Sequence, residues 1–148
     1  GLRVLVGDHP LPGERSAHAA GALGEAAARV GPLDLAVVLL SGGTSALVGA
    51  PARLAGPLAI PAAGAPDGRP RDDYTLAHDE LAALSAVLLG AGLPIDEINA
   101  VRKRFARWGA GRLARALAPA AVLGLCVSDV PGDEPATIGS GPLSPDPW

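Results

Sequence analysis

Three mainly apolar runs stand out along the chain, at residues 2–6, 35–40 and 121–127, and each has the length of a β-strand. The second run reads LAVVLL and contains no alternating polar residue, which is typical of a parallel strand covered on both faces. The third run, AVLGLCV, has the same character. We therefore predict three strands, with the second and third buried.

Between these runs, apolar residues recur at helical spacing, as in Leu81, Leu84 and Leu88. Ser16 lies near the start of the first such segment and is a candidate helix cap. The stretch 48–70 is rich in Pro, Gly and Ala and predicts a long excursion over the surface. The predicted helices cover residues 14–29, 72–90, 96–107 and 111–117.

Strands that alternate with helices predict one domain of the α/β class, a three-layer Rossmann-like domain with a mainly parallel sheet. Ligands of such sheets bind beyond the carboxyl ends of the strands. The turn-rich segments 7–14, 41–45 and 128–133 each follow a predicted strand, so we expect them to converge there. The chain begins directly in an apolar run and stops in a turn-rich segment, so we expect this domain to be incomplete at both ends.

The composition argues against several function classes. The 148 residues carry a formal net charge of -3 and 3% aromatic residues, which disfavours nucleic acid and anionic membranes as partners. No run approaches the roughly 20 apolar residues of a membrane-spanning helix. The single cysteine, Cys126, excludes an internal disulfide and is predicted to be a small buried side chain. We expect a cytoplasmic protein with neither nucleic-acid nor membrane partners.

The segment SGGTS after the second strand is the first candidate for ligand chemistry. Its two glycines allow a sharp turn and a close approach to a ligand, and the following helix start offers free N–H groups. These features predict an anion site, and a tight turn with an N-capping threonine is the alternative. The segment is neither a Walker A loop nor GxGxxG. Its residues are Ser41, Gly42, Gly43, Thr44 and Ser45.

The segment SDVPGD after the third strand is the second candidate. Asp129 and Asp133 flank a turn that contains Gly132, and carboxylates placed there suit Mg²⁺ carried by a nucleotide. Either carboxylate can also act as base for a substrate hydroxyl. The alternative is a turn in which aspartate only satisfies backbone N–H groups.

Two further segments offer polar groups. In the helix 96–107, Asn99 can share a face with either Arg102 or Lys103 and bind a phosphate or carboxylate, or these residues can form a solvated surface. Ser140 and Gly141 belong to another glycine–serine turn that could bind an anion. The remaining acid–base candidates, each with an ordinary turn residue as the alternative, are Asp8 and His9.

Together, GDHPLPGERS, DLAVVLLSGGTSAL, IDEINAVRKRFARWGAGRLA and SDVPGDEPATIGSGPLSPD, in this order, resemble the amino-terminal domain of the glycerate 2-kinases. The resemblance covers nearly the whole chain. It implies ATP-dependent phosphorylation of D-glycerate to 2-phosphoglycerate, with ATP and Mg²⁺ as cofactors and an active site between two α/β domains. The carboxy-terminal MOFRL domain of that family has no counterpart in this sequence, and a homodimer is one option for the assembly.

The resemblance also implies site residues. Its motifs correspond to residues 41–47, to Asn99, Arg102 and Lys103, to residues 128–133 and to residues 140–143. On this basis the catalytic candidates are Asp129, Asp133, Arg102 and Lys103, with Asp129 and Asp133 as Mg²⁺ ligands. The phosphate- or substrate-binding candidates are Ser41, Gly42, Gly43, Thr44, Ser45, Asn99, Gly132, Ser140 and Gly141.

Two departures from the family pattern qualify this prediction. Thr44 stands where the family usually has a third glycine, and Gly109 stands where it usually has a lysine. The chain as given is therefore not expected to carry out the full reaction by itself. The alternatives are a non-catalytic relative that binds a nucleotide or sugar acid and, less favoured, a hydroxypyruvate reductase.

Overall fold

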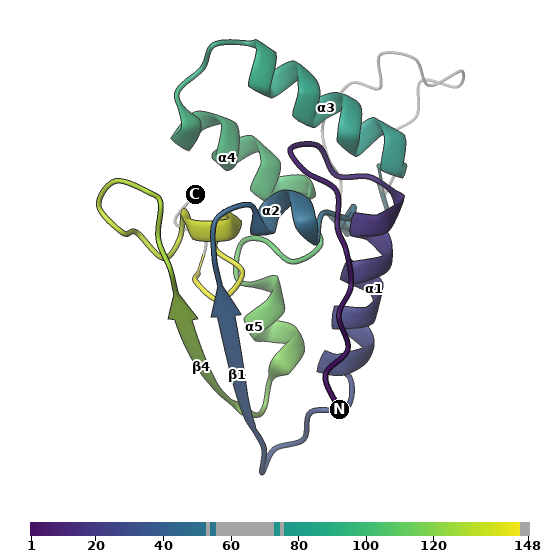
Figure 1. The fold of residues 1–148 in the computed structure, drawn as a ribbon, viewed down its shortest axis with the longest axis vertical. Coiled ribbons are helices and arrows are strands. Elements are labelled where there is room, and N and C mark those ends of the chain that lie inside the picture. The colour runs from purple at the N-terminus through teal and green to yellow at the C-terminus, as the bar shows by residue number, and fades with distance from the viewer. Residues whose placement is uncertain (53, 56–72, 75, 146–148) are drawn as a thin grey trace.

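The computed structural model describes residues 1–52, 54–55, 73–74 and 76–145 (Figure 1). Its central feature is a pair of parallel strands, β1 (Leu35–Leu40) and β4 (Ala121–Cys126), in register from Leu35 opposite Ala121 to Leu40 opposite Cys126. The path from β1 to β4 passes through four helices, as parallel pairing requires. The predicted α/β class with parallel strands is confirmed.

The predicted helices are confirmed with shifted ends. They are joined by a one-turn helix, a short 3₁₀ turn and an antiparallel pair of two-residue strands, β2 (Leu54–Ala55) and β3 (Asp73–Tyr74). The surface excursion predicted for residues 48–70 lies largely outside the described residues. The helices are α1 (Glu14–Ala27), α2 (Thr44–Leu47), α3 (His78–Gly90), α4 (Ile95–Phe105), α5 (Arg112–Leu117) and the 3₁₀ turn η1 (Ile138–Ser140).

The hydrophobic core lies on one face of the β1–β4 pair, where α1 and α5 pack. Trp108 is the largest side chain in this core, and its indole N–H donates to the backbone oxygen of Ala20 over 3.0 Å. This bond satisfies the one polar atom of the indole, so the ring can be buried without an unpaired donor. The other buried members are Ala20 and Ala27 of α1, Ala50, and Leu113 and Leu117 of α5.

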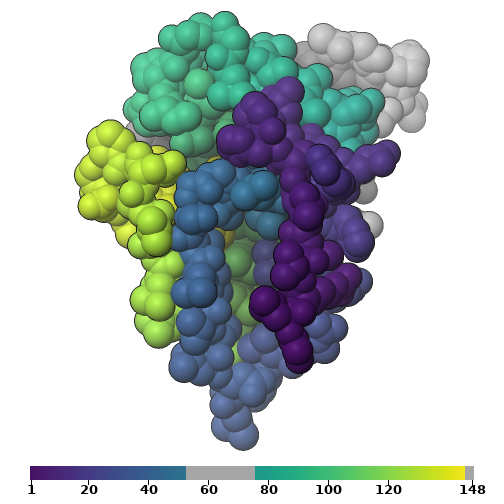
Figure 2. Space-filling model, viewed as in Figure 1, coloured from purple at the N-terminus to yellow at the C-terminus, as the bar shows by residue number. Residues whose placement is uncertain are grey.

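The prediction that both strands are buried on two faces is wrong. Exposure alternates along β1, where the side chains of Leu35, Val37 and Leu39 are open, and all of β4 is exposed, including Cys126. Figure 2 shows the strands uncovered on the face turned to the viewer. The apolar runs therefore predicted the two strands correctly. The second face of the β1–β4 pair is not covered by any described part of the chain.

The predicted strand at residues 2–6 is also wrong. This segment runs beside α1 without joining a sheet, and Leu2, Val4 and Val6 are exposed (Figure 1). An apolar run becomes a strand only when a neighbouring backbone pairs with it, and no described segment does so here. The segment is held to α1 by an exposed ion pair of 3.7 Å between Arg3 and Glu25.

Ser16 does not cap α1 as predicted, because it lies inside the helix and Gly13 is the residue before its first turn. The capping is done from outside the helix by Asp8, whose carboxylate accepts the backbone N–H groups of Arg15 and Ser16 over 3.1 and 3.3 Å. None of the described helices is long and apolar enough to cross a membrane.

Candidate ligand-binding cleft

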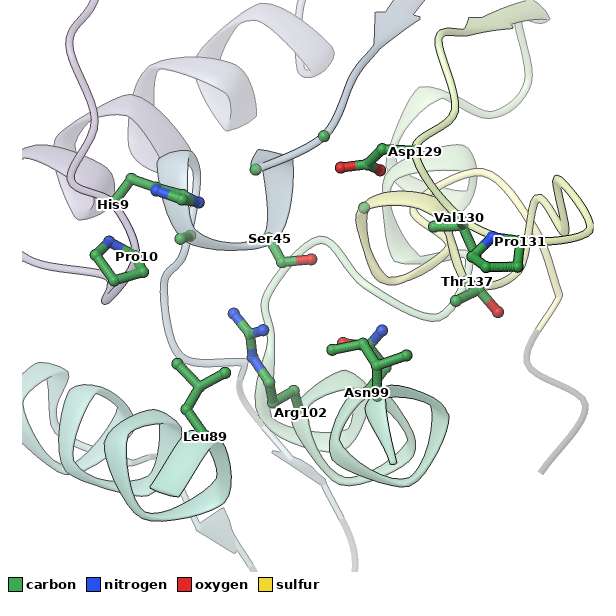
Figure 3. A pocket seen from close by; sticks show the side chains of 15 residues that line it. His9, Pro10, Ser45, Leu89, Asn99, Arg102, Asp129, Val130, Pro131 and Thr137 are labelled. Atoms are coloured by element: carbon green, nitrogen blue, oxygen red, sulfur yellow. The ribbon is translucent and has the colours of Figure 1, made fainter. Parts of the chain in front are cut away.

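A cleft of about 270 Å³ opens beyond the carboxyl ends of β1 and β4 (Figure 3). Its walls come from the turn 9–10, the loop 42–46, helices α3 and α4, and the loop 129–131 with residues 137 and 139. All three segments expected to converge at this edge of the sheet therefore do so. The parallel pairing places the segments after β1 and β4 there, because both strands end at the same edge of the sheet, whereas segment 7–14 reaches the cleft without following a strand.

Gly42 brings the loops that follow β1 and β4 into close contact. A β-carbon built on Gly42 would collide with the side-chain carboxylate of Asp129. The next residue, Gly43, has φ of 81°, a left-handed conformation that side chains other than glycine rarely adopt. The SGG sequence is thus required by the approach of Asp129 and by the turn into α2.

The backbone of this loop presents unused donors. Within the described residues, the N–H groups of residues 42–45 donate no hydrogen bond, although Gly43 accepts bonds through its carbonyl from Ala46 and Leu47. Successive free N–H groups in a turn make a concavity that attracts anions. The helix α2 has only four residues, so its macrodipole adds less than the prediction assumed, and the donors themselves are the relevant feature.

The hydroxyl groups of the loop are engaged internally. Thr44 Oγ1 donates to the backbone oxygen of Ser41 over 2.6 Å, and the Ser45 and Ser140 hydroxyls lie 2.7 Å apart. Gly42, Gly43 and Ser45 line the cleft, whereas Ser41 and Thr44 do not. Thr44 therefore fits the position of the family glycine without strain, and its hydroxyl stabilises the turn on the side away from the cleft.

Arg102 and Asn99 line the cleft from α4, as predicted. Figure 3 shows the Arg102 guanidinium pointing toward Ser45. This guanidinium is half-buried and makes no hydrogen bond or ion pair with any described residue, and its burial lowers the pKa of Arg102 below the ordinary value. An arginine remains charged nonetheless, so the cleft holds a desolvated cation without a counter-ion.

Lys103, by contrast, is buried and does not line the cleft, so the prediction that it acts beside Arg102 is not supported by its position. Adjacent residues of a helix point about 100° apart, and only one of the two can face the loop. The VRK motif alone did not show which one.

Arg112 has a structural role that the sequence did not reveal. Its guanidinium donates to the backbone oxygens of Lys103, Ala106 and Gly109 over 2.6, 2.9 and 3.1 Å, and to that of Arg104 over 3.1 Å. These carbonyls belong to the end of α4 and the turn that follows it, and the Gly109 oxygen also accepts the backbone N–H of Arg112 over 3.1 Å. Arg112 thereby fixes α4 in the orientation that aims Arg102 at the cleft.

Of the two carboxylates predicted to act together, only Asp129 lines the cleft. Asp133 lies in an exposed turn with φ of 53°, and its N–H donates to the oxygen of Val130 over 3.1 Å. Gly132 occupies the same exposed turn outside the cleft. Among the described residues, no three His, Cys, Asp or Glu side chains gather as a metal site. One carboxylate suits a Mg²⁺ ion held mainly by phosphates and water.

Ser140 and Gly141 lie behind the cleft rather than in its wall. The N–H groups of Ala110 and Gly111 donate to the oxygens of Ser140 and Gly141 over 3.0 and 2.8 Å. Ser140 is buried, and from this turn Gly139, with Thr137 before it, lines the cleft. Gly109, where the family has lysine, does not line the cleft either.

His9 lines the cleft opposite Asp129 (Figure 3). The sequence marked it only as a candidate acid or base in a turn, and the signal that could have ranked it higher is its place after an apolar run. Asp8 is excluded as a free acid or base, because its carboxylate binds Arg15 through Nε and NH2, both over 2.6 Å. The hydrogen bond from Arg15 holds the pKa of Asp8 below its usual value.

Fold and cleft together define an α/β protein with a candidate anion site at the carboxyl edge of a pair of parallel strands. The family model described as "Domain of unknown function (DUF4147)" matches residues 1–56 and 68–148, and the chain belongs to this family. A "D-glycerate 2-kinase" from Thermotoga maritima is 33% identical over 145 residues, which are 98% of this chain and 30% of the relative. A "Putative hydroxypyruvate reductase" from Agrobacterium vitis is 40% identical over 95% of this chain and 31% of its own length.

A solved structure agrees with these relatives. The crystal structure of glycerate kinase from Thermotoga maritima superposes with a TM-score of 0.73 at 33% identity, over 95% of this chain and 29% of that one. The resemblance inferred from the four motifs is therefore confirmed. The chain spans about three-tenths of the length of the curated relatives it matches.

Proposed function

We propose that the chain forms the glycerate-binding part of an ATP-dependent kinase that converts D-glycerate to 2-phosphoglycerate. The observation that carries this proposal is the half-buried guanidinium of Arg102, which lies in one cleft with the backbone N–H groups of residues 42–45, both without a hydrogen-bond partner among the described residues. Two sets of donors around one cavity suit an anionic substrate. The similarity to proteins named glycerate kinase supports the choice of glycerate among such substrates.

In the proposed reaction, the 2-hydroxyl oxygen of glycerate attacks the γ-phosphorus of ATP, and the bond to the bridging oxygen of ADP breaks. Asp129 accepts the hydroxyl proton, as a carboxylate within the cleft can. Arg102 and the loop N–H groups stabilise negative charge, and Asn99 and Ser45 orient the substrate. Asp129, the one carboxylate among the described residues that line the cleft, would approach a nucleotide-bound Mg²⁺, which would supply charge neutralisation.

The proposal is tested by measuring glycerate phosphorylation by the full-length protein and its Asp129→Asn variant. Because a positioned base contributes a factor of about 10²–10⁴, we expect kcat/KM to fall by that amount. Asp79→Asn is the matched control, since Asp79 is exposed in the first turn of α3 and does not line the cleft. An unchanged kcat/KM in Asp129→Asn would contradict the role assigned to this carboxylate.

A second candidate is a non-catalytic relative that binds a nucleotide or sugar acid without turnover. The replacement of the family lysine by Gly109 favours it. Calorimetry with ATP–Mg²⁺ and with glycerate, beside a coupled kinase assay, separates the two candidate functions. Binding without turnover would support the non-catalytic relative. A hydroxypyruvate reductase would consume NADH, and neither apolar strand is followed by GxGxxG.

The proposed setting of this activity is the cytoplasm, with small molecules rather than nucleic acid as partners. A net charge of -3 is consistent with this. A homodimer is the assembly that we propose to test by light scattering.

A further inference from the structure

The turn that carries His9 is attached firmly to α1. The backbone N–H of Asp8 donates to the Ser16 hydroxyl over 2.8 Å, and Ser16 is fully buried. The Asp8 carboxylate accepts two backbone N–H groups at the start of the helix and the Nε of Arg15. With the residue before it held from several sides, His9 leaves the turn at a defined position rather than on a free loop.

The imidazole of His9 lies directly over the start of the donor loop. A β-carbon built on Gly43 would stand 3.4 Å from His9 Cδ2 and 3.5 Å from Nε2, which is ordinary van der Waals contact. The Nε2 edge of the ring therefore borders the same space as the free N–H groups of residues 42–45. A neutral or a protonated imidazole can donate a hydrogen bond from this nitrogen.

The two sides of the cleft therefore differ in chemistry, with a hydrogen-bond donor at His9 and a carboxylate acceptor at Asp129. His9 and Asp129 lie on opposite sides, with Ser45 and the guanidinium of Arg102 between them (Figure 3). A 2-hydroxy acid needs different hydrogen-bond partners at neighbouring carbons. Its carboxylate needs donors, and its hydroxyl needs an acceptor when it loses a proton. Only one orientation of such a substrate meets both demands here.

We propose that His9 is a specificity-determining residue that binds the substrate carboxylate together with Arg102, so that the 2-hydroxyl faces Asp129. This inference rests on the proposed function and deepens it, since it states which end of the acceptor each side of the cleft holds. It also assigns a role to the GDHP segment, which the reaction as described above does not use.

The test compares His9→Ala, His9→Gln and His18→Ala in the full-length protein, with steady-state kinetics for both substrates. Removing a hydrogen bond to a charged group costs about tenfold or somewhat more, so we expect the KM for glycerate to rise by about that factor in His9→Ala. The KM for ATP and the thermal midpoint stay unchanged. His9→Gln keeps an N–H donor and restores part of the loss, and His18 is exposed on α1, away from the cleft.

The outcomes separate this inference from the function on which it rests. A normal KM for glycerate in an active His9→Ala variant contradicts the assignment of His9 and leaves the kinase proposal intact. A rise in the KM for ATP instead of glycerate also overturns the assignment, because it places the nucleotide on this side. Wild-type protein that neither binds nor phosphorylates glycerate overturns the proposed function and this inference together.

Discussion

Two glycine–serine turns of similar composition have different roles in this molecule. Within the described residues, the backbone N–H groups of residues 42–45 donate no hydrogen bond, and Gly42, Gly43 and Ser45 line the cleft. The turn 139–142 uses its carbonyls to accept bonds from the start of α5, and its serine hydroxyl binds Ser45. The first turn can therefore receive a ligand, while the second supports the first.

This difference teaches that glycine and serine content predicts a turn and leaves open what the turn does. The deciding quantity is whether other parts of the fold already satisfy its polar groups. For the turn 139–142 the partners come from residues 110–114, and the loop 41–45 meets no such partner among the described residues. Three substitutions test the contrast, from the largest expected effect to the smallest.

Gly42→Ala should have the largest effect, because the added methyl group occupies the place of the Asp129 carboxylate. The displaced carboxylate is the end of an exposed side chain that can rotate away, so we expect a loss of stability of no more than about 0.5 kcal/mol. We also expect glycerate turnover to fall by about 10²-fold or more, since misplacing a catalytic group costs that much. Urea unfolding and a coupled kinase assay measure the two effects.

The control for this substitution is Gly21→Ala in α1, where a β-carbon would meet nothing within 4 Å. A helix interior gains about 0.5–1 kcal/mol from this change, and activity should stay as in the wild type. If Gly42→Ala behaved like Gly21→Ala, the close approach of the two loops would not matter for function.

Ser140→Ala should affect stability and leave binding nearly intact. It removes the partner of the Ser45 hydroxyl in a buried turn, at a cost of about 1 kcal/mol. The KM for glycerate should change by less than about twofold, because Ser140 lies behind the cleft wall. A double-mutant cycle with Ser45→Ala isolates the coupling between the two hydroxyls. A large rise in KM with unchanged stability would show that this turn binds the ligand directly.

Ala110→Gly should have the smallest effect and the opposite sign. Ala110 has φ of 54° in the turn that docks on residues 140–142, and a left-handed alanine costs about 1–2 kcal/mol. We expect the glycine variant to be more stable by about 1 kcal/mol, measured as a higher urea midpoint. The same change at Ala116, exposed in α5, should lower stability by about 1 kcal/mol. If the two glycine substitutions changed stability in the same direction, Ala110 would not be under backbone strain.

Much of the site could be predicted from the sequence because the relevant signals are local. Apolar runs marked β1 and β4, and the loops after them had to lie at one edge of the sheet once the strands were parallel. Gly42, Gly43, Ser45 and Asp129 were candidates on that basis, whereas helical spacing and the family motif indicated Asn99 and Arg102. All six residues line the cleft.

The remaining assignments depended on partners distant in the sequence. Lys103 looked equivalent to Arg102, yet the packing of α4 buries one and directs the other into the cleft. Ser140 looked equivalent to Ser45, and residues 109–114 hold it behind the wall. The segment 2–6 had the composition of a strand, and pairing depends on a second backbone that its own residues do not specify.

By itself, the sequence determined the α/β class, the positions of the main helices and strands, and the residue types available at the edge of the sheet. It could do so because hydrophobic period and turn chemistry act over a few neighbouring residues. Only the tertiary structure decided which polar groups remain free, since a donor is free only when no distant segment has satisfied it. As a result, Arg102 and His9 line the cleft. The hydrogen bonds of Arg112, Asp8 and Ser140 instead hold the cleft walls in place.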